Sequence, residues 1–118
     1  MAYMLFVVEP RGQRAERGEE EGKAVYERML RYADDLKEKG VLRACSSLRN
    51  DSEGKQLQVR AGKRSLRDGP FTEAREMVGG FFLVDCATRE QALELAALCP
   101  AAEWATIEVR ETGPCYLG

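Results

Sequence analysis

Residues 3–8 read YMLFVV and residues 81–84 read FFLV, and these two apolar runs decide the fold of the chain. Each run has the length of a strand, and neither alternates between polar and apolar residues. A strand of this kind is covered by other side chains on both of its faces. The sequence therefore predicts two strands that are buried on both sides, one at the start of the chain and one in its second half.

A long helix is predicted between these strands. Residues 19–21 are three glutamates, and acidic side chains stabilise the first turn of a helix. Apolar side chains then recur at spacings of four, four and three along residues 25–36, which gives the segment one apolar face. Gly40 follows as a stop signal, so the pattern predicts a helix over residues 21–39.

A second helix and a last strand follow the FFLV run. Thr88, with Gln91 three residues later, forms the capping box that starts a helix. Pro100 limits the length of this helix. Residues 106–110 alternate between polar and apolar side chains and predict the last strand. Residues 111–118 are expected to form a short tail, because they contain a Gly-Pro pair.

The segments between these elements are expected to be less regular. Residues 41–48 predict a weak strand, and residues 57–67 predict a hairpin whose turn contains glycine. Residues 9–18 are charged and contain glycine, which indicates a loop. Residues 72–78 are polar and are expected to be irregular or to form one helical turn.

These elements fit a single domain spanning residues 1–118, with an ordered core over about residues 3–110, because a chain of this length has room for one core. Two helices cannot cover both faces of a small antiparallel sheet, so we expect both on one face, as in a ferredoxin-like α+β sandwich. The other face would expose apolar side chains. We therefore expect a homodimer in which two sheets pack face to face. The alternative is that residues 41–55 cover the open face.

The composition excludes several classes of function. The chain has no histidine, which removes the commonest general base, the commonest metal ligand and the usual partner of a nucleophilic Ser or Cys. The 18 basic and 20 acidic residues are mixed along the chain, so no basic patch for nucleic acid is expected. No apolar run reaches the about 20 residues of a membrane span. We expect no cofactor, no metal ion, no nucleic-acid partner and no membrane partner.

The four cysteines are widely separated and form no C-x-x-C pair, so they predict reduced thiols in a cytoplasmic protein. The apolar start of the chain lacks the basic region of a signal peptide, which favours the same location. Cys86 lies near the predicted start of the second helix and is the best candidate for a reactive thiol. A structural role is nevertheless the favoured interpretation for each cysteine.

The block DGPFTEARE at residues 68–76, followed by GGFF at residues 79–82, resembles the DGPF subgroup of the YCII-related family. The preceding hairpin and the following helix and strand fit the same pattern, so the resemblance extends from Tyr3 to Arg110. It implies a ferredoxin-like fold that pairs into a dimeric α+β barrel, with a cleft between sheet and helices. Relatives of this architecture include small-molecule isomerases and monooxygenases. Some DGPF members occur beside bacterial extracytoplasmic-function sigma factors, and the subgroup has no established activity. The His–Asp pair proposed for the YCII branch has no counterpart here, because histidine is absent.

Candidate site residues lie in the 68–76 block, and each has a second interpretation. Asp68 is a candidate general acid or base, although Asp-Gly-Pro is also a strong turn signal. Phe71 is either a pocket wall or a core anchor. Glu73 and Glu76 either line a cleft mouth or form weak surface ion pairs. The remaining members of the predicted ligand-binding block are Gly69 and Pro70. Outside it, the Gly79-Gly80 pair indicates either a bulge or a close approach of a ligand.

Two classes of function remain open from the sequence. The first is a small-molecule-binding or enzyme-like domain with a cleft near the DGPF block, in which a carboxylate transfers a proton. Because this block holds more acid than base, its ligand would be uncharged or cationic. The second is a non-catalytic interaction or regulatory module of the sigma-factor-associated type.

Overall fold

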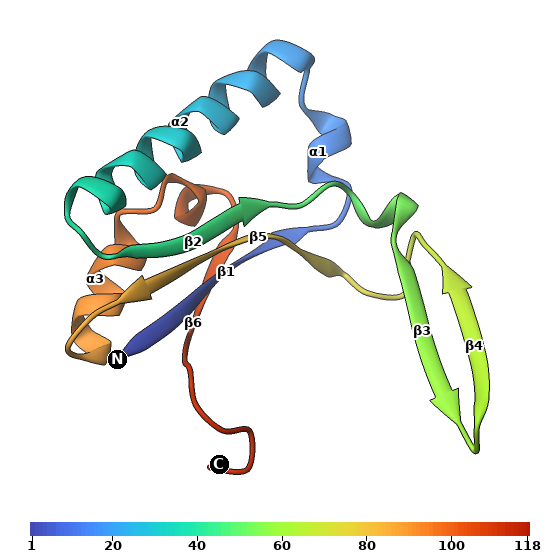
Figure 1. The fold of residues 1–118 in the computed structure, drawn as a ribbon. Coiled ribbons are helices and arrows are strands. Elements are labelled where there is room, and N and C mark those ends of the chain that lie inside the picture. Colours follow the sequence, from blue (N-terminus) through green and yellow to red (C-terminus); the bar gives the residue numbers. More distant parts are fainter.

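The computed structural model describes every residue from Met1 to Gly118 and confirms the predicted α+β architecture. Four antiparallel strands form one sheet in the order β2-β5-β1-β6 (Figure 1). Their bounds are Leu42–Ser47 for β2, Glu76–Asp85 for β5, Ala2–Pro10 for β1 and Thr106–Glu111 for β6. The two apolar runs of the sequence are therefore the two central strands. The prediction that both of their faces are buried is not met within one chain, because the helices cover only one face of the sheet.

The central strands β1 and β5 present apolar side chains to both faces of the sheet. Leu5 pairs with Phe82 on the face that the helices cover, and both side chains are buried. Phe6 pairs with Phe81 on the opposite face, where both are only half-buried. The side chains of Met4, Val8, Val78 and Leu83 share this open face. One side of the sheet is thus a core, and the other is an apolar surface.

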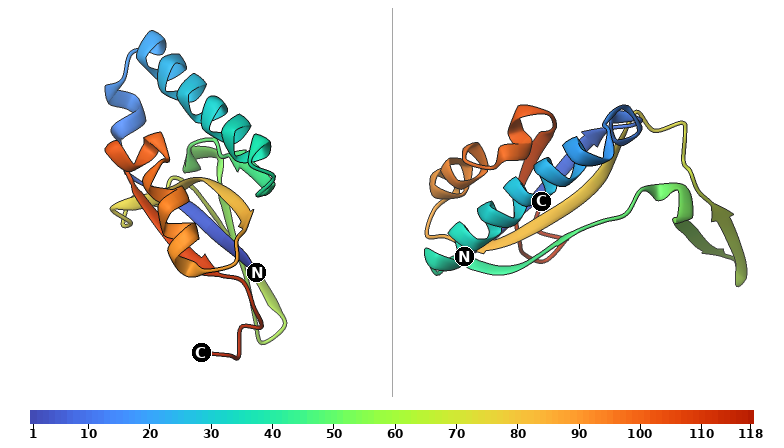
Figure 2. Two further views of the ribbon diagram at one scale, coloured as in Figure 1. Left: turned by 90° about the vertical axis from the view of Figure 1, so that its left-hand side faces the viewer. Right: turned by 90° about the horizontal axis from the view of Figure 1, so that it is seen from above.

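Both predicted helices pack on the same face of the sheet (Figure 2). They are α2 (Glu19–Glu38) and α3 (Arg89–Ala97). The amide of Gln91 donates to the Thr88 side chain at 3.2 Å, which confirms the predicted helix start. Short helical turns form α1 (Gln13–Glu16), η1 (Asp51–Glu53) and η2 (Pro100–Glu103). None of these helices is both long and apolar enough to span a bilayer.

The main core lies between the sheet and the two longer helices. Its side chains come from β1, β5, α2, α3 and the segment around η2, and they include Tyr3, Leu5, Val7, Tyr32, Leu36, Phe82, Val84, Ala92, Ala96, Cys99 and Ala101. The Tyr32 ring meets the Phe82 ring edge-on at 5.0 Å between centroids. This core contacts the C-terminal half of α2, whereas the N-terminal half of the helix covers the cavity described below.

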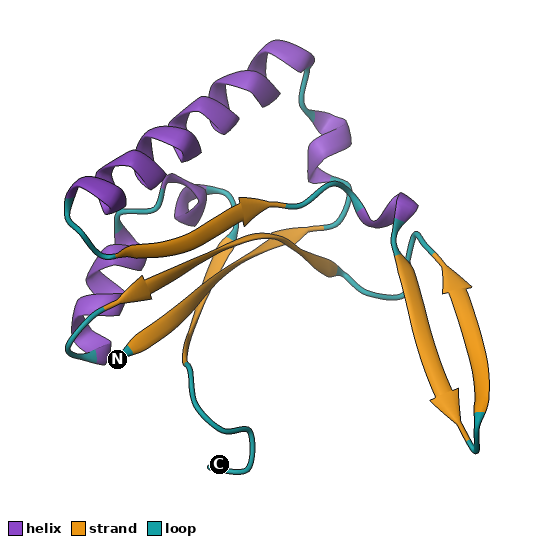
Figure 3. Cartoon of the chain, viewed as in Figure 1, coloured by secondary structure: helices purple, strands orange, loops and turns teal.

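The predicted hairpin forms as β3 (Lys55–Arg60) and β4 (Lys63–Asp68), and it projects from the body of the domain (Figure 3). Every residue of its two strands is exposed. The radius of gyration of the chain is 16.1 Å. A compact domain of this length has a radius of gyration of about 13.5 Å. The hairpin is therefore an exposed arm that contacts the rest of the chain near its base.

Several sequence expectations about boundaries are wrong. The segment 9–18 is not a loop, because Glu9 and Pro10 continue β1 and residues 13–16 form α1. Residues 76–78 belong to β5 and not to an irregular segment. Glu111 ends β6, so the tail is one residue shorter. Residues 42–47 form an edge strand of the sheet and therefore do not cover its open face.

Candidate functional site

Asp68 ends β4 on the surface of the projecting hairpin. Its carboxylate accepts a hydrogen bond from the Lys55 ammonium at 2.6 Å, and 70% of its side chain is exposed. The next peptide bond, Gly69–Pro70, is cis. Both the turn role of the motif and the acid–base role of Asp68 stay predictions.

Gly69 is required by a close backbone contact at the base of the hairpin. A Cβ atom on Gly69 would lie 1.9 Å from the carbonyl oxygen of Asp51, a distance that no side chain can occupy. The Gly69 amide also donates to the carbonyl of Gly54 at 2.8 Å. The glycine of the DGPF block thus brings the end of β4 against η1.

Asp51 joins the hairpin base to the end of β1. Its two carboxylate oxygens accept hydrogen bonds from the Arg11 guanidinium at 2.8 and 2.5 Å, in a bidentate pair. Arg11 also donates through Nε to the carbonyl of Ala74 at 2.8 Å. The hydrogen bond from Arg11 holds the pKa of Asp51 below its ordinary value, and the pair raises the pKa of Arg11. The Arg11–Asp51 pair therefore connects the base of the hairpin to the end of β1 and sets the direction in which the arm projects.

The other members of the block make local contacts near the base of the hairpin or lie on the surface. Phe71 is half-buried beside Gly54, and the Arg67 guanidinium lies 5.3 Å from the centre of its ring. Glu73 pairs with Arg67 at 2.7 Å, and this hydrogen bond lowers the pKa of the Glu73 carboxyl. Glu76 is exposed at the start of β5. The structure therefore brings Phe71 and Glu73 together around Arg67 and leaves Asp68 and Glu76 apart from them.

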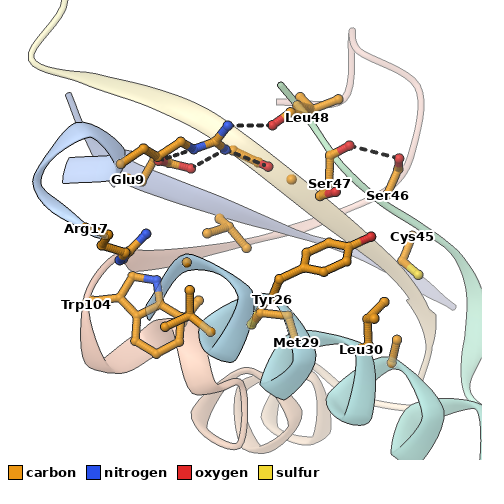
Figure 4. Close-up of a pocket in the computed structure, with 18 of the residues that line it drawn as sticks. Glu9, Arg17, Tyr26, Met29, Leu30, Cys45, Ser46, Ser47, Leu48 and Trp104 are labelled. Carbon is orange, nitrogen blue, oxygen red and sulfur yellow. Dashed lines mark hydrogen bonds and ion pairs between the residues drawn. The ribbon is translucent and has the colours of Figure 1, made fainter. Parts of the chain in front are cut away.

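A cavity of about 630 Å³ lies elsewhere, between the first half of α2 and the strands β1, β5 and β2 (Figure 4). None of the six residues predicted from the block lines it. Its wall is largely apolar, with side chains that include Val7, Val25, Tyr26, Met29, Leu30, Phe82 and Trp104. Polar groups reach it from Glu9, Arg14, Arg17, Glu19, Cys45, Ser46 and Ser47. A volume of this size is in the usual range for a site that holds a small molecule.

An ion pair between the buried Glu9 and the partly exposed Arg14 forms one polar part of this cavity. Arg14 donates to the two Glu9 carboxylate oxygens at 2.8 and 2.7 Å, and only 8% of the Glu9 side chain is exposed. Arg14 also donates to the carbonyl of Leu48 at 2.8 Å and so connects β1 to the end of β2. Both charges are therefore satisfied within the chain.

Gly79 makes room for the Glu9 carboxylate. The register of β1 against β5 shifts at this point, since Val7 pairs with Gly80 and Val8 pairs with Val78. Gly79 is thus the extra residue of a β-bulge, which confirms one of the two interpretations of the glycine pair. A Cβ atom on Gly79 would lie 1.7 Å from a Glu9 oxygen.

Sequence reasoning missed Glu9 because its charge and the neighbouring Pro10 indicate a loop. The signal that identifies it is its phase, since Tyr3, Leu5, Val7 and Glu9 fall on alternate positions and all four are buried. A charged residue that continues the buried phase of a strand indicates a paired carboxylate in the interior.

The buried phenols and thiols have structural environments. The Tyr32 hydroxyl donates to the carbonyl of Leu95 at 2.6 Å, and burial raises the pKa of Tyr32. Burial likewise raises the pKa of Cys86 and of Cys99, which disfavours the reactive thiolate form. Cys45 and Cys115 are exposed and all four thiols are free. The structural interpretation of Cys86 is therefore the better one.

The fold and the cavity define a ferredoxin-like α+β domain with a pocket beneath its long helix. The model of the YCII-related domain matches residues 1–114, so the chain belongs to the YCII-related family. An uncharacterised protein of Rhizobium meliloti (strain 1021) is 45% identical over 40 residues, which are 34% of this chain and 32% of that protein. The match thus spans about a third of that relative's length. Assignment to the DGPF subgroup stays a prediction.

Proposed function

We propose that this domain binds a small molecule in the cavity between α2 and the sheet. The observation that supports this proposal is the combination of a cavity of about 630 Å³, a largely apolar wall and a few polar groups that converge on it. The Glu9–Arg14 pair and the bulge at Gly79 shape one end of the cavity. The sequence hypothesis of a ligand-binding domain is therefore kept, and its site is moved from the DGPF block to the space beneath α2.

Gly22 provides a test that leaves the fold intact. It lines the cavity within α2, and a Cβ atom there would meet nothing within 4 Å. Gly22→Leu should fill part of the cavity, while Gly22→Ala is the matched control that adds only a methyl group. Both changes favour the helix, because glycine costs about 1 kcal/mol relative to alanine in a helix interior.

The experiment is a thermal-shift screen of the purified protein against a metabolite library. A ligand at a hundredfold excess over its Kd stabilises the native state by about 2.7 kcal/mol, which raises the Tm by several degrees. Hits should disappear in Gly22→Leu and persist in Gly22→Ala. Hits that persist equally in both variants would contradict the cavity as the site. A screen without hits, together with a stoichiometric protein partner, would favour the interaction or regulatory module instead.

The acid–base role of Asp68 is a separate proposal. It is supported by the position of this carboxylate at the end of β4, next to Gly69, whose amide donates to the carbonyl of Gly54. Asp68→Asn should abolish turnover of a substrate that binds at the DGPF block and leave ligand binding in the cavity unchanged. Turnover that survives the substitution would contradict an acid–base role for Asp68.

We also propose that the domain works as a homodimer. The open face of the sheet carries Phe6 and Phe81 at its centre, half-buried and uncovered within the chain. The arm adds charge complementarity between copies. Residues 55–68 hold five basic residues and one acidic residue, whereas the rest of the chain holds 13 basic and 19 acidic residues. An arm with net positive charge therefore suits the acidic body of a second copy.

Light scattering on a sizing column tests the dimer. The wild-type protein should have twice the chain mass of 13.2 kDa. Phe81→Lys on the open face should shift the mass to that of a monomer, whereas Leu93→Lys on the exposed side of α3 should not. A wild-type monomer at micromolar concentration would contradict the proposal.

A further inference from the structure

One of the charged side chains that line the cavity has no ion-pair partner. Glu9 and Arg14 neutralise each other, and Glu19 is paired with Lys23 at 3.5 Å on the surface of α2. Arg17 also lines the cavity, but it takes part in no ion pair. Its single side-chain hydrogen bond goes to the neutral Gln13 amide oxygen at 3.1 Å. Arg17 is therefore the lining charge without a counter-ion in the chain.

The aromatic ring of Trp104 holds this guanidinium at the cavity. The Arg17 carbon Cζ lies 5.5 Å from the ring centroid, within the range of a cation–π contact. Figure 4 shows Arg17 beside Trp104 at one end of the cavity, with Cys45 and Leu30 at the other end. Of the five N–H groups of a guanidinium, one is used by Gln13, so donors remain for a ligand.

We infer that the cavity selects a small organic acid, whose carboxylate binds Arg17 and whose apolar body lies against Tyr26, Met29 and Phe82. This inference rests on the proposed function and specifies its ligand class. The apolar wall offers contacts to the body of the ligand, and the unpaired guanidinium matches the planar geometry of a carboxylate. An expectation based on the acidic 68–76 block alone would favour an uncharged or cationic ligand instead.

Arg28 offers a matched control for Arg17. It lies 5.4 Å from the centroid of the same Trp104 ring, but it is paired with Glu103 and does not line the cavity. Arg17→Gln and Arg28→Gln therefore each remove one cation from the same aromatic ring. Only the first removes a cation that faces the cavity.

The test compares 4-butylbenzoate with 4-butylbenzamide, which differ in charge and little in shape. Binding is measured by calorimetry and by the fluorescence of Trp104, which is the only tryptophan of the chain. A hydrogen bond to a charged partner is worth about 1.5–3 kcal/mol, so the benzoate should bind at least about tenfold more tightly than the amide. Arg17→Gln should remove this preference, and Arg28→Gln should keep it.

Three results would overturn the inference. They are equal binding of the two probes, a preference for the benzoate that survives in Arg17→Gln, and failure of both probes to bind at millimolar concentration. Equal binding that is lost in Gly22→Leu would overturn the anion preference and leave the cavity as a binding site. The Tm of each variant is measured alongside, so that a loss of folding is recognised as such.

Discussion

At the scale of single residues, Glu9 and Arg14 form an ion pair next to the apolar core. Glu9 occupies a position of β1 whose neighbours in phase are Leu5 and Val7, and its carboxylate is kept in the interior by Arg14. A buried charge without a partner is strongly unfavourable, so each member of the pair depends on the other. Gly79 is part of the same arrangement, because any side chain there would displace the carboxylate.

The first prediction concerns this pair. Arg14→Met should lower the free energy of unfolding by about 3 kcal/mol, because it leaves the Glu9 carboxylate buried and unpaired. The double variant Glu9→Leu/Arg14→Met should lose less than the single variant. Chemical denaturation of both variants measures the difference. Equal losses in the single and double variants would contradict the cost assigned to the unpaired Glu9 carboxylate.

The second prediction is the dependence of stability on pH. The pKa of Asp51 is lowered in the fold from its ordinary value of 3.8. The ionised Asp51 carboxylate therefore stabilises the fold above that value, and this stabilisation is lost as the pH falls below it. The pKa values of Cys99 and Tyr32 are raised from 9.0 and 10.0, so their contributions are lost as the pH rises above these values. The Tm should therefore be flat between about pH 5 and 8 and fall on both sides.

Hydrogen exchange can test the contribution of Asp51 to the acid side of this profile. Exchange at the Gly69 amide should accelerate relative to the sheet amides as the pH falls through the lowered pKa of Asp51, because the Arg11–Asp51 pair at the base of the hairpin is then lost. Asp51→Asn should show the same fast exchange at neutral pH and no further acid-induced change. An unchanged acid transition in Asp51→Asn would contradict the assignment.

At the scale of elements, the sequence predicts the regular parts of the fold and misses those that depend on distant contacts. The strands β1, β5 and β6 and the helices α2 and α3 follow from apolar periodicity and from capping residues such as Thr88. The start of β5 was missed because residues 76–78 become a strand only by pairing with residues 8–10. The resemblance implies a cleft between sheet and helices, but the residues that line the cavity were not predicted, since they are brought together only by the packing of the first half of α2 over the sheet.

The third prediction concerns the hairpin turn. Ala61 has a φ of 52° and Gly62 a φ of 75°, which is the geometry of a two-residue turn that favours Asn-Gly. Ala61→Asn should therefore stabilise the arm by about 1 kcal/mol, since alanine is strained in the left-handed region. Hydrogen exchange of the β3 and β4 amides should slow by about fivefold. Gly62→Ala is the opposite control and should accelerate the exchange.

At the scale of the whole molecule, three features of the chain lack a partner within it, namely the open sheet face, the projecting arm and the cavity. The open sheet face and the projecting arm both suit a second copy of the chain. The cavity beneath α2 lies on the other side of the sheet, next to the helices. The proposed dimer through the open face would therefore leave the cavity unobstructed, and the proposed assembly and ligand binding would use opposite faces of one sheet.

The most direct test of ligand binding in this cavity is the change in glycine amide signals when a hit from the screen is added to ¹⁵N-labelled protein. Gly18, Gly22, Gly79 and Gly80 line the cavity, whereas Gly54 and Gly69 lie at the base of the hairpin. Binding beneath α2 should shift the first group strongly and leave the second group nearly unchanged. Shifts concentrated at Gly54 and Gly69 would contradict the account and place the site at the DGPF block.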